Sequence, residues 1–376
     1  MSELEGSPSV NTPDFLWFCQ LSRDGEFVGT KTLPPRKPTL PYLSSLIETA
    51  GEAGFSSLLT ATNYHHENET WTAGVAALAR TQGAGLLLAV RPGMYPPAIF
   101  AKMVSTAANL FPGRVRVNIV TGSSPAENAM YGDFEAHAKR YERTREFMLL
   151  LRKLWDETPV SFEGEVYRIE NAVLEPKPPE TVPLYFGGAS DAAQHIAAEL
   201  ADVYLMWGEP QEMIAERLGK MRGLEAEYGR KLRYGLRTHV IVRETEAEAW
   251  AAAERMISRI DPEVRQAFLE SYKHVDSVGQ RRQIEMGLSG DLLVEANLWA
   301  GIGLARSGVG VAIVGDPQQV ADKLKGYGKM GIDTFILSSY PHLEEARRFG
   351  ELVMPHFQGD KEAGRSVHTD TVAPAF

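Results

Sequence analysis

Cysteine is almost absent from this chain, since Cys19 is the only one in 376 residues. A single thiol excludes an intrachain disulfide framework and most cysteine-built metal sites, as expected in a reducing compartment. Positive charge is also scarce, because 39 Lys and Arg residues stand against 49 Asp and Glu residues, a net charge of -10. This balance argues against nucleic acid or an anionic membrane as partner and favours a small-molecule ligand.

Long hydrophobic runs are absent too, and none approaches the length of a membrane span. Residues 1–13 lack the basic start and apolar stretch of a signal peptide, so we expect a cytoplasmic protein with a flexible N-terminus. Residues 358–376 are polar and follow the last apolar segment. We expect them to form a C-terminal tail, either a disordered end or a segment that docks on the neighbouring subunit.

Strand-like and helix-like segments alternate along the rest of the chain. Eight such units predict a closed TIM (β/α)8 barrel as one domain over 14–357, with a doubly wound open sheet as the alternative. A β-hairpin at 159–172 and a long irregular region at 261–315 are predicted as insertions that add no second core. The eight expected strands are 15–21, 55–62, 85–91, 114–122, 182–188, 202–208, 232–242 and 333–340.

The segment GLRTHVIVRE (235–244) places Arg237 and His239 two residues apart in a run of β-formers. Both side chains then point to the same face of a strand, and a buried Arg requires a negative partner. The pair indicates either an anion site or a structural Arg–carboxylate pair beside a hydrogen-bonded core histidine. Barrel chemistry lies at the C-terminal ends of strands, and the polar residues expected there favour the anion site. They are Asn63 to His66, Asn118, Trp207, Tyr340 and His342.

Two glycine-containing loops are further candidates for binding. The turn FGGASD (186–191) follows a strand and opens a helix, so it could hold a phosphate, although such turns are also ordinary strand-to-helix connections. Small residues surround Arg306, which predicts either a mobile lid over 276–310 that closes on an anion or a solvated surface arginine. No metal is expected, because the adjacent His65 and His66 face apart and no carboxylate spacing completes a ligand set.

Several collinear segments resemble the FMNH2-dependent alkanesulfonate monooxygenases of the bacterial luciferase-like family over roughly residues 15–357. They include VRVNIVTGSSPAEN, KRYERTREF, PLYFGGASD, YLMWGEP and NLWAGIGLARSGVGVAIVGDP. The resemblance implies a TIM-like barrel that uses O2 and reduced FMN, the latter delivered by a separate NAD(P)H-dependent flavin reductase. It further implies a homo-oligomer, a dimer or tetramer, that cleaves a C–S bond to give sulfite and an aldehyde.

The same resemblance implies roles for individual residues. Gly188, Ala189 and Ser190 would bind the FMN phosphate beside Tyr141, with Asn118 near the flavin ring. The sulfonate would be met by residues from three strands and the lid. These are Trp207, Arg237, His239, Tyr340 and Arg306, of which the last four would be catalytic.

Two loops depart from the alkanesulfonate pattern. FCQLSRDGE (18–26) lacks the proline and histidine of those enzymes, and NYHHENE (63–69) replaces their serine–cysteine–glutamate loop. Polar groups there suit a polyol better than an alkyl tail. The variant resembles the sulfoquinovose monooxygenases, which give 6-oxo-glucose; the alternatives are an aliphatic substrate or a non-catalytic flavin- or sulfonate-binding protein. The polar groups are Gln20, Asn63, His65, His66 and His342.

Overall fold

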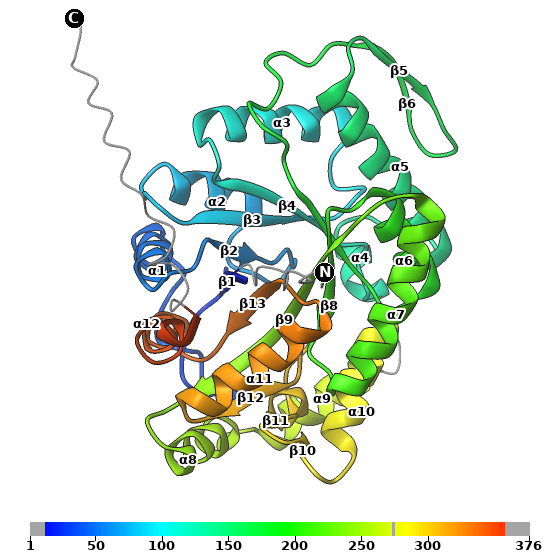
Figure 1. Cartoon of the computed structure of the whole chain (residues 1–376). Coiled ribbons are helices and arrows are strands. Elements are labelled where there is room, and N and C mark those ends of the chain that lie inside the picture. Colours follow the sequence, from blue (N-terminus) through cyan, green and yellow to red (C-terminus); the bar gives the residue numbers. More distant parts are fainter. Residues whose placement is uncertain (1–11, 273–274, 358–376) are drawn as a thin grey trace, which may run out of the picture.

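The computed structural model describes residues 12–272 and 275–357, which form a barrel of parallel strands enclosed by helices (Figure 1). Closure is made by the pairing of β9 with β8 and β13, and of β13 with β1. The predicted TIM barrel is confirmed, and this closure excludes the open sheet. The barrel strands are β1 (Asp14–Cys19), β2 (Ser57–Thr60), β3 (Gly85–Val90), β4 (Val115–Ile119), β7 (Leu184–Gly187), β8 (Val203–Trp207), β9 (Arg233–Val242) and β13 (Thr334–Ser338).

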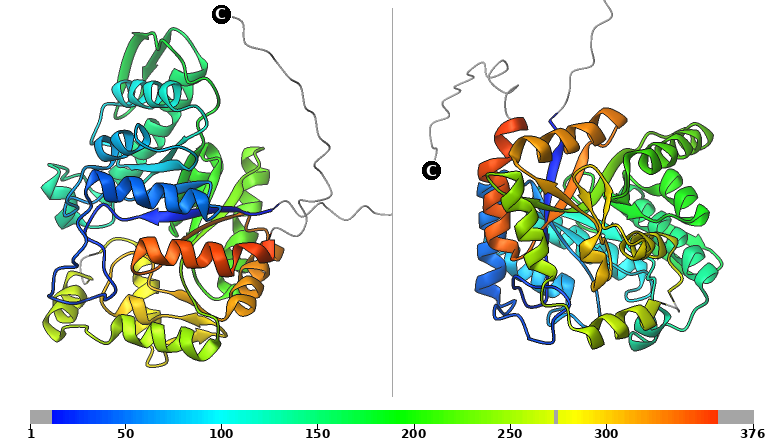
Figure 2. Two further views of the ribbon diagram at one scale, coloured as in Figure 1. Left: turned by 90° about the vertical axis from the view of Figure 1, so that its left-hand side faces the viewer. Right: turned by 90° about the horizontal axis from the view of Figure 1, so that it is seen from below.

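Helices cover the outside of the barrel (Figure 2). Several begin at side chains that cap free backbone N–H groups: Thr245 and Asp316 form capping boxes, and Ser190 caps the helix after β7. None of the described helices is long and apolar enough to cross a membrane. Around the barrel lie α1 (Leu40–Glu52), α2 (Thr70–Leu78), α3 (Pro97–Leu110), α4 (Pro125–Met130), α5 (His137–Asp156), α6 (Asp191–Leu200), α7 (Gln211–Tyr228), α8 (Glu246–Ile257), α11 (Pro317–Met330), α12 (His342–Leu352) and η2 (Met354–Phe357).

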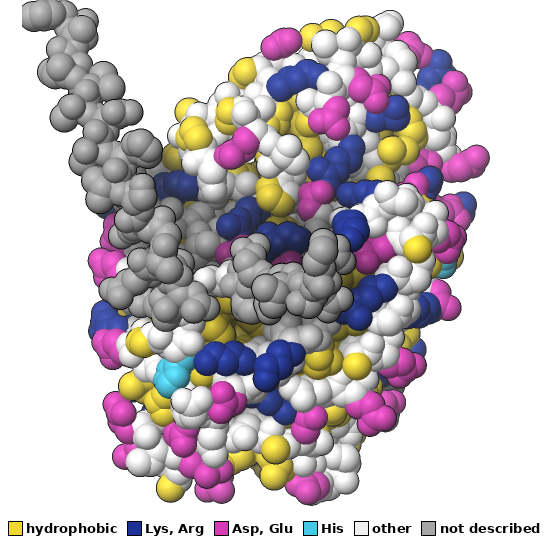
Figure 3. Space-filling view, in the orientation of Figure 1, with side chains coloured by type: hydrophobic (Ala, Val, Ile, Leu, Met, Phe, Trp, Pro, Cys, Tyr) yellow, Lys and Arg dark blue, Asp and Glu magenta, His cyan; other side chains and the backbone are white. Residues whose placement is uncertain are grey.

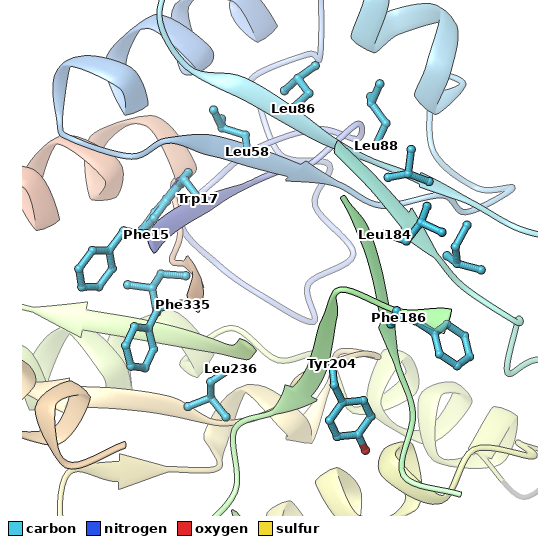
Figure 4. Close-up of a cluster of buried hydrophobic side chains, with 14 of the residues drawn as sticks. Phe15, Trp17, Leu58, Leu86, Leu88, Leu184, Phe186, Tyr204, Leu236 and Phe335 are labelled. Carbon is cyan, nitrogen blue, oxygen red and sulfur yellow. The ribbon is translucent and has the colours of Figure 1, made fainter. Parts of the chain in front are cut away.

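Alternate residues of each strand enter two different apolar cores. Side chains such as Phe15, Trp17 and Leu86 point outward and pack in the layer between strands and helices (Figure 4). The intervening side chains, among them Leu16 and Phe18, fill the barrel interior. The alternation fixes which polar residues of a strand face inward, and it places Arg237 and His239 on the inward face of β9, because Leu236, Val240 and Val242 pack in the outer core.

The predicted hairpin insertion is present as β5 (Val160–Glu163) and β6 (Arg168–Ala172). Gly164 N donates to Tyr167 O across its turn. The Glu146 carboxylate on α5 accepts hydrogen bonds from the backbone N–H groups of residues 165, 166 and 167. This carboxylate therefore anchors the hairpin to the barrel.

The second insertion was predicted to be irregular, and that prediction is wrong. Its strand β12 pairs in parallel with the last four residues of β9, from His239 opposite Ala312 to Val242 opposite Gly315. The strands of this insertion have two to four residues each, too short for a sequence pattern, and β12 forms because β9 extends beyond its barrel neighbours. The insertion contains α9 (Pro262–Tyr272), α10 (Val278–Leu288), β10 (Leu293–Glu295), β11 (Leu298–Trp299), η1 (Gly301–Leu304) and β12 (Ala312–Gly315).

Outside this insertion, two more helices were not anticipated. The segment around Asn128 contains the short helix α4, and α11 fills the stretch before β13. Both begin with proline after a capping Ser or Asp, a start signal that the sequence does carry. Residues 1–11 and 358–376, which hold most of the expected flexible N-terminus and the tail, lie outside the described residues.

Candidate active site

Arg237 is a buried cation on the inward face of β9, with only 6% of its surface exposed. Its Nη1 donates to Thr238 O at 2.7 Å, and its guanidinium lies 4.7 Å from the centre of the Phe18 ring. No carboxylate of the described residues pairs with it. Burial, with a smaller contribution from the nearby Arg306, lowers the pKa of Arg237 to about 9. The barrel therefore contains a positive charge that lacks a counter-ion among the described side chains.

Arg306 brings a second positive charge to the same place. It lies on the loop between η1 and β12, and its Nη1 is 3.4 Å from His239 Nε2. Its guanidinium lies 5.8 Å from the Phe18 ring centre and 5.7 Å from the Tyr340 ring centre. Like Arg237, it has no carboxylate partner within the described ranges. Two neighbouring cations repel each other, so an anion bound between them would offset both charges.

The contact with Arg306 favours one tautomer of His239. A guanidinium can only donate, so His239 Nε2 accepts from Arg306, and Nδ1 therefore carries the proton. That Nδ1–H donates to Ser338 Oγ at 2.7 Å. Burial, followed by Arg237 and Arg306, lowers the pKa of His239 well below its usual value. The ring is thus a neutral imidazole whose lone pair faces Arg306.

Tyr340 and His342 follow β13 and complete this side of the site. The Tyr340 ring stacks on His239, with ring centres 5.7 Å apart, and burial raises the pKa of its hydroxyl. His342 Nε2 donates to Gln20 Oε1 at 3.1 Å, which leaves its buried Nδ1 as an acceptor with no partner among the described residues. Burial lowers the pKa of His342 to about 4, so this ring is also neutral.

The two histidines of the loop after β2 differ in their relation to the arginines. His66 is half-buried, and burial lowers its pKa, with Arg306 among the charged groups that act on it. His65 is exposed and places its ring against the edge of Tyr64, so the structure does not bring it together with the arginines. The Asn63 side chain accepts from the His65 N–H at 2.8 Å within the turn.

The turn between β7 and α6 forms a cradle for a small anionic group. Ser190 Oγ accepts from Ala193 N at 3.3 Å and donates to Tyr141 Oη at 3.1 Å. A Cβ at Gly188 would lie 2.5 Å from Ala193 Cβ, so the backbone here approaches α6 more closely than a side chain allows. Free N–H groups at the α6 N-terminus and two hydroxyls suit a phosphate. Asn118 is buried on β4, at its C-terminal half.

Trp207 lies between the arginine pair and the cradle of the β7–α6 turn. It ends β8, is half-buried, and would be 3.5 Å from a Cβ placed at Gly279 in the first turn of α10. The same hypothetical Cβ would lie 3.8 Å from Ala189 Cβ. The first turn of α10 therefore covers both the tryptophan and the cradle.

Sequence reasoning missed several residues of the site. Phe18 lies under both guanidinium groups, and Ser338 Oγ is the hydrogen-bond partner of His239 Nδ1. Ser338 could have been found, because the predicted strand 333–340 places it on the same face as Tyr340. Arg91, which follows β3, is buried and donates hydrogen bonds to Glu127 at 2.9 Å and Asn128 at 2.8 Å.

No group of three or more His, Cys, Asp and Glu side chains in the described part of the chain could hold a metal ion.

Comparison with solved structures shows the same fold in several enzymes of low sequence identity. A riboflavin lyase, solved with modified FMN and riboflavin, has 20% identity and a TM-score of 0.77 over 96% of this chain and 94% of that one. The EDTA monooxygenase of Chelativorans sp. BNC1 has 19% identity and a TM-score of 0.75 over 93% and 94%. A long-chain alkane monooxygenase has 19% identity and a TM-score of 0.75 over 96% and 94%.

The comparison with protein families identifies the chain more directly. Residues 14–334 match the family described as luciferase-like monooxygenase. That range contains seven of the eight barrel strands in full, together with the cradle and Arg306. The chain therefore belongs to the luciferase-like monooxygenase family.

Proposed function

We propose that this protein is a two-component flavin monooxygenase that cleaves the C–S bond of an organosulfonate and releases sulfite and an aldehyde. The observation that carries the proposal is the pair Arg237 and Arg306, two cations beside a neutral His239 with no carboxylate partner in the described residues. A sulfonate is a permanent anion at neutral pH, and its oxygens suit the fork of guanidinium donors.

Reduced FMN fits the cradle at the start of α6. Gly188, Ala189 and Ser190 would hold its phosphate with Tyr141, and Asn118 would lie beside the ring. When bound, reduced FMN supplies the two electrons that activate O2, so that one oxygen atom enters the aldehyde and the other leaves as water. A separate NAD(P)H-dependent flavin reductase would supply this reduced cofactor.

Individual residues of the chain would have different roles in binding and proton transfer. Arg237 and Arg306 would bind the sulfonate oxygens and stabilise charge that develops as sulfite leaves. His239 would accept the proton lost from the carbon next to sulfur. Burial is the largest cause of its lowered pKa, and the bound anion would offset the further lowering by the two arginines. The protonated hydroxyl of Tyr340 would donate a hydrogen bond, and Trp207 would form a wall of the site. The lid over 276–310 would exclude water.

A sulfosugar suits the remaining polar groups better than an alkyl sulfonate. The Gln20–His342 pair leaves a buried nitrogen acceptor that a ligand donor, such as a sugar hydroxyl, could satisfy. Half-buried His66 offers a further polar atom near Arg306. We therefore propose sulfoquinovose as the substrate, with 6-oxo-glucose as the organic product.

A sulfite assay with a flavin reductase, NADH, FMN and O2 tests the proposal. We expect sulfite from sulfoquinovose and much less from octanesulfonate. Preference for octanesulfonate would reassign the substrate to the aliphatic class. Absence of sulfite from both, with flavin and sulfonate still bound, would instead indicate a binding protein.

A further inference from the structure

The Gln280 side chain of α10 holds the Arg306 loop by its backbone. Its Oε1 accepts from Gly308 N at 2.7 Å, and its Nε2 donates to Gly308 O at 3.1 Å. One amide thus satisfies both backbone groups of a residue two positions after Arg306. Gln280 is almost fully buried, at 5% exposure.

Gln283 lies one turn further along the same helix and continues this attachment. Its Oε1 accepts from Gly310 N at 2.7 Å, and its Nε2 donates to Gly208 O at 2.8 Å. Gly208 directly follows Trp207 at the end of β8. Gln283 therefore links the Arg306 loop to a barrel strand that carries another site residue.

Close backbone contacts allow the glutamine side chains to reach the loop. A Cβ at Gly303 would lie 3.2 Å from Gln283 O, and one at Gly310 would lie 2.7 Å from Gly303 Cα. At Gly303 and Gly310 a Cβ atom would therefore be too close to the neighbouring backbone. Helix α10, η1 and the loop at 308–310 are therefore packed as one block.

We propose that Gln280 and Gln283 are positioning residues that hold Arg306 over the anion site. This inference rests on the proposed function, because it takes Arg306 as a ligand of the sulfonate. The two arginines repel each other when no anion is bound, so the loop needs an attachment that does not involve Arg306 itself. Neutral amides provide it through hydrogen bonds to the loop backbone.

Trypsin cleavage after Arg306 measures how firmly the loop is held. Gln280→Met keeps the side-chain length and removes both hydrogen bonds, so we expect cleavage at this bond to rise at least about tenfold in the substrate-free enzyme. Gln283→Met should act in the same direction and serves as a second variant if the first is poorly folded. Gln318→Met on the exposed face of α11 is the matched control, since Gln318 bonds Asp322 within its own helix. Mass spectrometry quantifies the fragments, and equal cleavage in wild type and both α10 variants would overturn the inference.

The variant Gln280→Glu provides a sharper test. A protonated carboxyl group can accept from Gly308 N and donate to Gly308 O as the amide does, so this variant should protect the bond after Arg306 at acid pH. The ionised carboxylate cannot donate to Gly308 O. Cleavage of Gln280→Glu, divided by cleavage of wild type at the same pH, should therefore increase as the pH rises. Gln318→Glu should show no such dependence. A ratio of Gln280→Glu to wild-type cleavage that stays constant with pH would contradict the attachment, because a packing role alone does not titrate.

Steady-state kinetics separate this role from a catalytic one. A loosened loop lowers the fraction of enzyme ready to bind sulfonate, so Gln280→Met should raise KM about tenfold and leave kcat within about twofold. A fall in kcat at unchanged KM would overturn the positioning role. If wild type releases no sulfite, the proposed function fails, while the cleavage comparison still decides whether the glutamines hold the loop.

Discussion

At the scale of single residues, Arg237 combines burial with the absence of a counter-ion among the described side chains. A cation in this setting destabilises the free protein, because burial removes its hydration without a compensating charge. A bound anion would relieve this cost. Affinity for the ligand and stability of the free protein should therefore respond in opposite directions to changes at Arg237.

The first prediction concerns Arg237→Met. We expect kcat/KM for the sulfonate to fall at least about a hundredfold, since a charged hydrogen bond in a water-excluded site is worth roughly 3 kcal/mol. The melting temperature should stay equal or rise, because a buried unpaired charge is replaced by an apolar side chain. Arg233→Met, at the exposed start of the same strand, is the control. An unfolded Arg237→Met protein would show that Arg237 is structural.

The second prediction concerns pH. The charged form of Arg237 binds the sulfonate, and that form is lost as the pH rises through the lowered pKa of about 9. The value of kcat/KM should therefore decline above that pH, whereas kcat should decline at higher pH, because a bound anion raises the pKa of Arg237. A pH profile of both constants measures this difference. An identical alkaline limb in Arg237→Met would assign the titration to another group.

At the scale of elements, the β7–α6 turn depends on the close approach of its backbone to the helix. Gly188 has no room for a Cβ, and Tyr204 Oη donates to Gly188 O at 2.5 Å from the neighbouring strand. Ser190 meanwhile caps α6 and bonds Tyr141. The cradle is therefore held by contacts with α6, with Tyr141 on α5 and with Tyr204 on β8.

The third prediction is that Gly188→Ala weakens FMN binding at least about tenfold, because the added methyl group must displace the start of α6 from the phosphate position. Fluorescence titration with FMN measures the effect. Gly219→Ala on α7 is the matched control, since nothing lies within 4 Å of its added Cβ. That control should bind FMN normally and gain up to about 1 kcal/mol of stability from higher helix propensity. Normal binding by Gly188→Ala would place the phosphate elsewhere.

At the scale of the whole molecule, the anion site is a local feature of an acidic protein. Basic and acidic side chains are interspersed on the face shown in Figure 3, and the chain as a whole carries a net charge of -10. Arg237 instead lies buried in the barrel, where solvent and salt screen it little, and Arg306 is half-buried beside it. Ligand binding there should be visible in the stability of the entire domain.

The fourth prediction is a thermal shift. Sulfoquinovose at about a hundred times its Kd should stabilise the fold by roughly 2.7 kcal/mol and raise the melting temperature by several degrees. Glucose lacks the anion and should have little effect. The shift should disappear in Arg237→Met. A shift that survives in this variant would mean that the sulfonate binds away from β9.

The fifth prediction concerns the tail at 358–376, which lies outside the described residues. Truncation after Phe357 should leave turnover and the oligomeric state unchanged if the tail is a free end, which its polar composition favours. Sedimentation and sulfite release measure both properties. Loss of oligomer affinity together with turnover would show that the tail docks on a neighbouring subunit.

Local signals in the sequence were sufficient to predict the barrel and the composition of its strands, because alternation and helix boundaries involve only near neighbours along the chain. The two-residue spacing of Arg237 and His239 was enough to place them on one face. The FGGASD turn was likewise enough to locate the start of α6.

Contacts between groups far apart in the sequence depend instead on the assembled barrel. Arg306 reaches His239 over 67 residues, and Ser338 reaches it over 99. The absence of a carboxylate partner for Arg237 within the described chain is likewise a property of the folded barrel and cannot be inferred from its neighbours in sequence. The short strand β12 forms only because the end of β9 offers it backbone partners, and a pattern of four residues carries no such information.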